Sequence, residues 1–233
     1  MKSSNQTDTI SDELICGIDE AGRGPVLGPL VLCGVCFFKS NLPYLIEIGA
    51  KDSKKLTPKR RDKLAKLIKE KCHSYEIIVV SAQEIDEREK KRITMNRLEE
   101  LKMAEIINQL KPDVIYIDAA DVNEERFGTS IKKLLEYIPK KIISKHKADD
   151  IYPIVSAGSI IAKDKRDAII EELKQEYGEI GSGYPSDKRT TDFLRDYIKS
   201  HKEIPEFVRK TWETTKKILN DEIGNKKITD YLK

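Results

Sequence analysis

Acidic side chains stand at the borders of three segments of this 233-residue chain. Asp19 and Glu20 close one apolar run, and Asp118 ends a second. Asp149 comes just before a long predicted helix. A set of carboxylates without Cys and without a clear His favours hard ions such as Mg²⁺ or Mn²⁺, which usually work with phosphates. Such a set would cleave a phosphodiester, one ion generating the attacking hydroxide and another steadying the leaving oxygen.

Each acidic segment also has a plainer interpretation. Asp19 and Glu20 fit a solvated pair in a turn, and Asp118 fits the first residue of a turn. Asp149 fits an acid that caps the start of a helix. Asp150 follows Asp149 directly, so the choice of the fourth acid stays open on residue chemistry alone.

The segment after the first acidic pair contains two glycines, Gly22 and Gly24. Neighbouring side chains on a strand point to opposite faces, so Asp19 and Glu20 face one site only if the strand breaks there. The two glycines supply such a break and allow the backbone to approach a ligand. The spacing through Gly28 does not match the dinucleotide-binding fingerprint, and no Gly-Lys-Ser/Thr completes a nucleotide-binding loop.

Alternating and continuous apolar patterns predict the elements that position these residues. Strands are expected at 14–19, 27–38, 75–80, 113–118 and 141–144. Helices are expected from 58 through the apolar stripe at 64–68, at 93–110, 131–137 and 153–177, and over most of the remainder. Thr57 and Pro58 are suited to the start of the first of these helices. Strands concentrated in the first two-thirds, with helices between them, indicate an α/β layer fold with a C-terminal helical extension.

The net charge limits the kinds of partner that the chain can bind. The 43 Lys and Arg nearly balance the 40 Asp and Glu, which leaves a formal charge of +3. This balance argues against charge-driven disorder and against a polycationic protein that wraps nucleic acid. It fits moderate, salt-sensitive binding of a polyanion. The basic side chains suited to that role are Arg23, Lys54, Lys55, Lys59, Arg60 and Lys147.

The four cysteines do not indicate a metal site. Cys33 and Cys36 form a Cys-x-x-Cys pair, but residues three apart on a strand point to opposite faces. No second pair completes a tetrahedral zinc site. We therefore expect Cys16, Cys33, Cys36 and Cys72 to be structural thiols, as buried free cysteines usually are.

The N-terminal segment and the hydropathy pattern bear on location. Residues 1–13 lack an apolar signal-peptide core, and no apolar run approaches the roughly 20 residues needed to span a bilayer. The sequence therefore predicts a soluble, cytoplasmic protein without a membrane partner.

Six motifs, in order, resemble the ribonuclease HII family, and the form of two segments resembles its archaeal branch. The resemblance extends from about residue 14 to residue 219. The six motifs are Asp-Glu-Ala-Gly-Arg-Gly-Pro at 19–25, Lys-Asp-Ser-Lys-Lys-Leu at 51–56, Tyr-Ile-Asp at 116–118, His-Lys-Ala-Asp at 146–149, Ser-Ala-Gly-Ser-Ile-Ile-Ala-Lys at 156–163 and Gly-Ser-Gly-Tyr-Pro-Ser-Asp at 181–187.

The resemblance implies a ribonuclease H-like fold, in which helices flank a mixed central β-sheet. It implies a catalytic domain at 14–182 and a helical extension at 183–224 packed on it, with flexible tails at 1–13 and 225–233. The implied activity is an endoribonuclease of DNA replication and repair. It would hydrolyse the RNA strand of RNA/DNA hybrids and cut 5′ of ribonucleotides embedded in duplex DNA, leaving 3′-OH and 5′-phosphate ends.

The resemblance also assigns roles to residues. The catalytic, metal-binding acids would be Asp19, Glu20, Asp118 and Asp149, and alignment with the Lys-Ala-Asp triplet selects Asp149 over Asp150. The substrate-binding residues would be Gly22, Arg23 and Gly24 at the 2′-OH and its neighbouring phosphate, Lys54 at a backbone phosphate and Tyr184 on the following sugar. The cofactor would be Mg²⁺ or Mn²⁺. We expect a monomer, and no clear motif at 225–233 supports a sliding-clamp partner.

Overall fold

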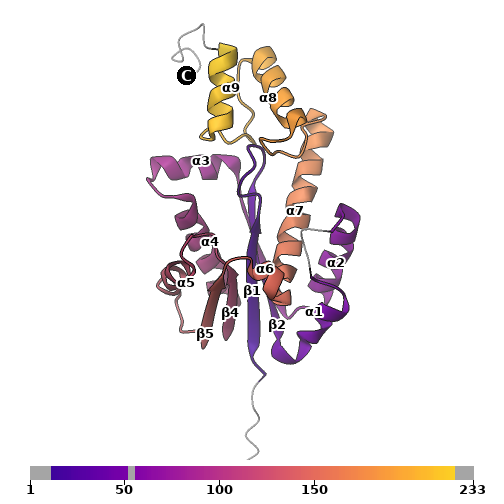
Figure 1. Ribbon diagram of the computed structural model, residues 1–233, viewed down its shortest axis with the longest axis vertical. Coiled ribbons are helices and arrows are strands. Elements are labelled where there is room, and N and C mark those ends of the chain that lie inside the picture. The colour runs from indigo at the N-terminus through magenta and orange to yellow at the C-terminus, as the bar shows by residue number, and fades with distance from the viewer. Residues whose placement is uncertain (1–11, 52–55, 224–233) are drawn as a thin grey trace, which may run out of the picture.

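The computed structural model describes residues 12–51 and 56–223. Lys54 and the 225–233 tail lie outside these described residues, as does most of the tail expected at 1–13. One five-stranded sheet forms the centre of the molecule, with the strand order β3-β2-β1-β4-β5 (Figure 1). The strands are β1 (Leu14–Ala21), β2 (Leu30–Phe38), β3 (Ser74–Val80), β4 (Val114–Asp118) and β5 (Lys141–Lys145).

The sheet is mixed, as the family resemblance implies. Strand β1 pairs antiparallel with β2 and parallel with β4, while β4 pairs parallel with β5. Strand β3 pairs antiparallel with β2 at the other edge. Because β1, β4 and β5 run in the same direction, their carboxyl ends meet at one end of the sheet. That end holds the acidic segments found in the sequence.

Helices cover both faces of the sheet and form a separate group at one end (Figure 1). The helices are α1 (Pro43–Glu47), α2 (Pro58–Lys71), α3 (Ala82–Lys90), α4 (Met95–Leu110), α5 (Glu124–Lys132), α6 (Ala148–Ile151), α7 (Pro153–Tyr177), α8 (Lys188–His201) and α9 (Glu213–Ile223), with a 3-10 turn at Lys39–Asn41. Helices α7, α2 and α1 pack on one face, and α4 and α5 on the other.

Side-chain alternation along the strands follows the sequence prediction. On β4, Val114 packs in the core cluster beneath α7, whereas Ile115 packs in the cluster beneath α4. Cys33 and Cys36 likewise belong to opposite clusters, so the Cys-x-x-Cys pair does not converge. The start of α2 is also confirmed, since the Thr57 hydroxyl accepts a hydrogen bond from the backbone N–H of Arg60.

Two predicted elements have boundaries that are wrong by three residues or more. The helix expected at 131–137 is α5, which ends at Lys132 and begins after Asn123, whose side chain accepts from the N–H of Arg126 at 2.8 Å. The second strand begins at Leu30 rather than at residue 27. Residues 26–28 instead bond to the backbone of the C-terminal part, at residues 183 and 207, so tertiary contacts replace strand pairing there.

The C-terminal helices share a third apolar cluster with the end of α7. Val26 and Leu27 enter this cluster beside Ile170, Leu194 and Ile218. Leu27 also forms an isolated antiparallel bridge with Val208. The loop that follows β1 is therefore enclosed by residues from the far end of the chain. Within the described ranges, no helix is both long enough and apolar enough to cross a membrane.

Candidate active site

The acidic segments meet where β1, β4 and α6 come together. Asp118 is half-buried at the end of β4, and its Oδ1 accepts a hydrogen bond from the backbone N–H of Ala148 at 2.7 Å. This bond holds the first turn of α6 against β4. Asp149 follows and is 3% exposed, whereas Asp150 is exposed. Burial beside β4 therefore distinguishes Asp149 from its neighbour.

Asp19 and Glu20 do not lie side by side on one face. Strand β1 continues to Ala21, so the strand break expected at this pair is wrong. In the β1–β2 register, Asp19 lies opposite Cys33, and Glu20 lies opposite Leu32. Those two partners belong to opposite core clusters. The site therefore straddles the end of the sheet, with Asp19 on the α7 side and Glu20 on the α4 side.

The acids nevertheless act on one another electrostatically. Burial raises the pKa of Asp19 well above its usual range, and the charges of Glu20 and Asp118 raise it further. A hydrogen bond from Ser159 and the charge of Lys163, both on α7, oppose this rise in the pKa of Asp19. Neighbouring negative charges of this kind favour a bound cation or a retained proton.

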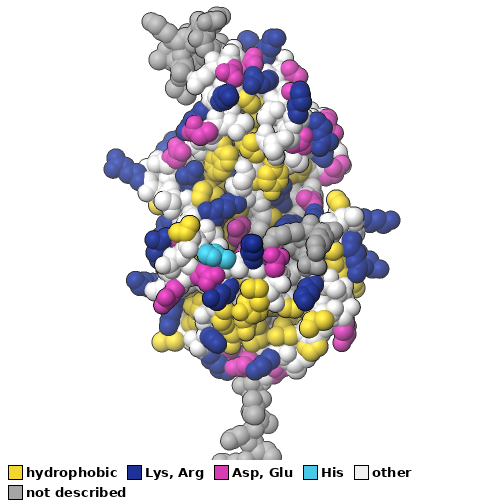
Figure 2. Space-filling view, in the orientation of Figure 1, with side chains coloured by type: hydrophobic (Ala, Val, Ile, Leu, Met, Phe, Trp, Pro, Cys, Tyr) yellow, Lys and Arg dark blue, Asp and Glu magenta, His cyan; other side chains and the backbone are white. Residues whose placement is uncertain are grey.

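The pKa of Glu20, on the other side of the sheet, is raised by the same two causes, burial and neighbouring negative charges. Burial raises its pKa well above the usual range, and the charges of Glu99, Asp118 and Asp149 add to the effect. The charge of Arg23 opposes this rise. Acids from β1, β4 and α6 thus share one electrostatic environment. On the face of the molecule drawn in Figure 2, acidic side chains lie near the middle, and Lys and Arg side chains are spread around them.

The turn after β1 requires glycine at its first position. Gly22 has a φ of +89°, and a Cβ there would lie 2.5 Å from the carbonyl oxygen of Pro29. Gly24 is different, since it is exposed and its Cβ would meet only the Tyr184 ring, at 3.9 Å. The backbone at Gly24 is therefore open to a ligand beside Tyr184.

The side chain of Arg23 turns toward α4. Its Nη1 donates to Glu99 Oε2 at 2.6 Å, and its Nη2 donates to Asn96 Oδ1 at 2.6 Å. From the C-terminal part of the chain, Arg209 donates to the backbone carbonyls of Gly22 and Arg23. The loop is thus held through its side chain on one side and through its backbone on the other.

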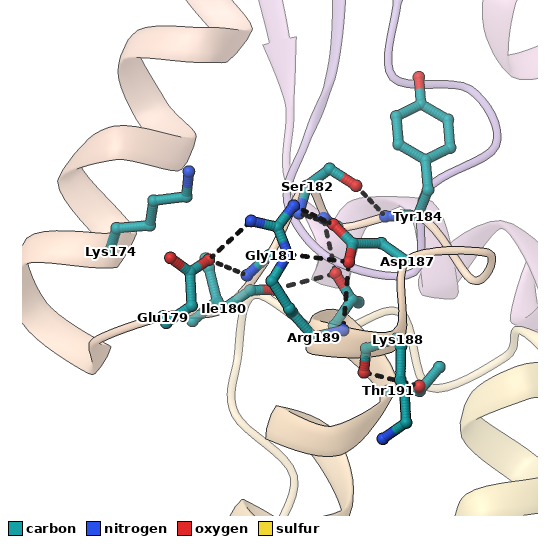
Figure 3. Close-up of polar contacts among 12 residues, drawn as sticks. Lys174, Glu179, Ile180, Gly181, Ser182, Tyr184, Asp187, Lys188, Arg189 and Thr191 are labelled. Atoms are coloured by element: carbon teal, nitrogen blue, oxygen red, sulfur yellow. Dashed lines mark hydrogen bonds and ion pairs between the residues drawn. The ribbon is translucent and has the colours of Figure 1, made fainter.

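Tyr184 is placed by a loop that Asp187 stabilises (Figure 3). The Asp187 carboxylate accepts from the N–H of Ser182 at 2.8 Å and from the guanidinium of Arg189 at 2.9 Å. These bonds hold the pKa of Asp187 well below its usual range. The Tyr184 ring points away from this cluster and stacks on the buried guanidinium of Arg166, whose Cζ is 5.5 Å from the ring centre.

Comparisons with known proteins agree with this arrangement. The ribonuclease HII family model matches residues 16–215. The ribonuclease HII of Thermococcus onnurineus is 53% identical over 206 residues, which cover 88% of this chain and 89% of that protein. The chain belongs to the ribonuclease HII family. It is therefore a metal-dependent endonuclease of RNA in RNA/DNA hybrids, as its motifs implied.

Two solved structures of family members also share the fold. The crystal structure of the ribonuclease H2 from Pyrococcus horikoshii OT3 has a TM-score of 0.85 and 48% identity, covering 89% of this chain and 98% of that chain. The structure of the PCNA:RNase HII complex from Archaeoglobus fulgidus has a TM-score of 0.80 and 42% identity, covering 88% of this chain and 96% of that chain. The ribonuclease H-like fold predicted from the motifs is confirmed.

The donors at the site fit a divalent cation, which the ribonuclease HII family requires. In the described part of the chain, the buried Oε2 of Glu20 has no hydrogen-bond partner. No three Asp, Glu, His or Cys side chains of that part form a ready-made cage. Mg²⁺ does not need one, because it is commonly held by one or two carboxylates together with substrate phosphates and water. Such an ion would neutralise the mutual repulsion of the site's carboxylates and give the Glu20 oxygen a partner.

Several side chains at this ribonuclease HII site received no role from the sequence. Ser159 and Lys163 lie in a motif that carried the resemblance, so position in that motif was the available signal. Arg209 lies in the segment 208–212, one of the two that resemble the archaeal branch, so it had a similar signal. Glu99 had none, because charged residues in a predicted helix usually lie in solvent. Both are fully buried. The position of Lys54, a predicted phosphate ligand, lies outside the described residues.

Proposed function

We propose that the chain cuts on the 5′ side of a ribonucleotide, both in RNA/DNA hybrids and in duplex DNA that contains single ribonucleotides. The products would carry 3′-OH and 5′-phosphate ends. The observation that supports this best is the meeting of Asp19, Glu20, Asp118 and Asp149 beside an exposed glycine backbone and a projecting tyrosine.

The four acids would hold the divalent cations, as the resemblance implies. Cations held there would supply Lewis-acid activation of the attacking water and charge neutralisation at the leaving oxygen. Asp118 is coupled to both acids of β1, since its charge raises the pKa of Asp19 and of Glu20. Asp19 keeps its orientation through Ser159, and its charge is partly balanced by Lys163. In this proposal the acidic groups bind the metal, and the basic groups attract the phosphates.

Selection of the ribonucleotide would come from the turn after β1 and from Tyr184. The 2′-OH is the group that separates RNA from DNA at a given site. Exposed backbone at Gly24 can approach it without a side chain in the way. Tyr184, 42% exposed, would stack on the following sugar and favour deoxyribose there. Arg23 at the neighbouring phosphate and Lys54 at a backbone phosphate complete the proposed contacts.

The central test replaces Asp118 with asparagine. Asn keeps an oxygen for the Ala148 N–H but removes the charge, so we expect cleavage to fall by at least about 100-fold while binding of the hybrid persists. The matched control is Asp150→Asn, an exposed acid next to Asp149, which should keep normal activity. Full turnover by Asp118→Asn at saturating Mg²⁺ would contradict the assignment.

A substrate panel tests the specificity. Duplex DNA, an all-RNA/DNA hybrid and duplex DNA with one ribonucleotide are incubated with the enzyme, and the cut positions and end groups are mapped. We expect cuts 5′ of ribonucleotides in the last two substrates and none in the first. Cleavage of plain duplex DNA would contradict selection at the 2′-OH.

The choice between Mg²⁺ and Mn²⁺ is a finer proposal. The all-carboxylate donors suit both ions. EDTA should abolish cleavage, and titration of the stripped protein with each ion then ranks them by activity. Cleavage that survives EDTA would contradict a metal mechanism.

We propose that the chain acts as a monomer. A sliding clamp is the partner class to test. The support for a clamp is the relative from Archaeoglobus fulgidus, whose structure is a PCNA:RNase HII complex. Analytical size exclusion of the full chain, alone and with its own clamp, measures both properties. A variant that ends at residue 223 shows whether the tail contributes to clamp binding. Absence of a shift with the full chain would contradict the partner.

We also propose the division into a catalytic domain at 14–182 and a packed helical extension at 183–224. The shared cluster of Leu27, Ile170 and Leu194 supports close packing of the two parts. A cytoplasmic location, expected from the sequence, fits an enzyme whose substrate arises where DNA is replicated.

A further inference from the structure

The guanidinium of Arg23 is held by the first two turns of α4. Both of its terminal nitrogens have partners there, Glu99 and Asn96, each at 2.6 Å. The Arg23 side chain is 36% exposed, while that of Glu99 is not exposed at all. A two-point hold on a planar guanidinium fixes its orientation as well as its position. The loop that starts at Gly22 is therefore tied to α4, which packs on the face of the sheet opposite α7.

Glu99 is an unfavourable residue for stability alone. Its neighbours on α4, Leu98 and Met103, belong to the apolar core. Its Oε1 is buried without a hydrogen-bond partner among the residues that the structure describes. A buried, half-satisfied carboxylate costs free energy that an apolar side chain of similar size would not. The contact that Glu99 does make, to Arg23, is thus the feature that requires an acid there.

Asn96 connects the same helix end to the loop that follows β4. Its side chain also bonds to Asp121, which lies three residues after Asp118. Asp121 is 6% exposed and is further held by the guanidinium of Arg126. The first turn of α4 therefore links the loop after Glu20 to the loop after Asp118.

We propose that Glu99, together with Asn96, is a positioning residue for the reaction: it fixes Arg23 and so holds the Gly22–Gly24 backbone where the ribose must lie. Glu99 is too buried to reach the substrate, so it acts through Arg23. This inference rests on the proposed function of the loop. It adds α4 to the elements that determine ribonucleotide recognition.

A double-mutant cycle tests the proposal. Glu99→Gln, Arg23→Gln and the double variant are compared with the wild type on duplex DNA with one ribonucleotide, at saturating Mg²⁺. We expect Glu99→Gln to lower kcat/KM by roughly 10- to 100-fold, the size of effect that a misplaced reacting group causes. In the Arg23→Gln background, the same change should have almost no further effect.

The matched control is Glu100→Gln on the same helix. Glu100 is also buried, at 7% exposed, but its partners are Arg97 at 2.9 Å and Ser130 at 2.6 Å. Its replacement should lower the melting temperature about as much as Glu99→Gln while leaving kcat/KM within about twofold of the wild type. Equal losses of activity in the two variants would overturn the proposal, because a general loss of helix stability would explain both.

Other outcomes also decide the question. An equal effect of Glu99→Gln in both backgrounds would overturn the proposal, because the acid would then act on the site independently of Arg23. If Glu99→Gln does not fold, the half-buried Asn96→Ala replaces it in the same cycle, and absence of coupling to Arg23 overturns the proposal. Failure of the wild type to cut any substrate would refute the proposed function itself, and this role with it.

Discussion

Replacing Arg209 with methionine would release the turn after β1 from the C-terminal part of the chain. Arg209 is fully buried, and its guanidinium donates to three backbone carbonyls of that turn. The distances are 2.5 Å to Gly22, 2.9 Å to Arg23 and, from two nitrogens, 3.0 and 3.1 Å to Gly28. Methionine fills much of the same space but donates nothing, so these carbonyls lose their partners.

The size of the effect follows from that geometry. A buried acceptor left without a donor costs about 1–3 kcal/mol. The loss is partly offset, because a buried guanidinium is itself costly, and burial lowers the pKa of Arg209 to about 9. We therefore expect Arg209→Met to lower the free energy of unfolding by about 3–5 kcal/mol. For a chain of this length, that corresponds to a melting temperature lower by roughly 6–20 °C.

Chemical denaturation and calorimetry of the purified variant measure this loss. The control is Arg195→Met on α8. The Arg195 side chain is 39% exposed, and its guanidinium pairs with Asp221 and Glu222. An exposed pair of this kind contributes about 0–1 kcal/mol. If Arg209→Met unfolds within about 1 kcal/mol of the wild type, the three carbonyls do not depend on Arg209 and the reasoning is refuted.

Two further predictions concern the glycine turn and the buried acids. Gly24→Ala should keep the wild-type melting temperature but lower cleavage. Gly22→Ala should lower the melting temperature, because its Cβ would collide with the backbone. Equal melting temperatures of the two variants would contradict this prediction. Burial raises the pKa of Glu99 to about 7 and raises those of Asp19 and Glu20, so the folded state holds protons that the unfolded state releases above about pH 4.5. The metal-free protein should therefore lose stability between about pH 5 and pH 8, and added Mg²⁺ should oppose the loss, as thermal melts with and without EDTA would show.

Local patterns in the sequence were enough to predict much of the framework. Alternation of apolar residues placed Val114 and Ile115 on opposite faces of β4, since the side-chain period of a strand is two residues. Thr57 marked the start of α2 because a cap depends only on its nearest neighbours. The acidic motifs, in their order along the chain, were sufficient to identify the family. Each of these signals is contained in a short run of neighbouring residues.

Contacts between distant segments were decided only by the tertiary structure. The strand does not end at Asp19, so whether Asp19 and Glu20 share a face depended on how far β1 pairs with β2. Arg209 and Gly22 are 187 residues apart, yet they form one of the bonds that shape the turn. Glu99 looks like a solvent-exposed helical acid until α4 packs against the sheet beside Arg23. Burial and pairing of a charge depend on what the rest of the chain brings to it, which local sequence does not encode.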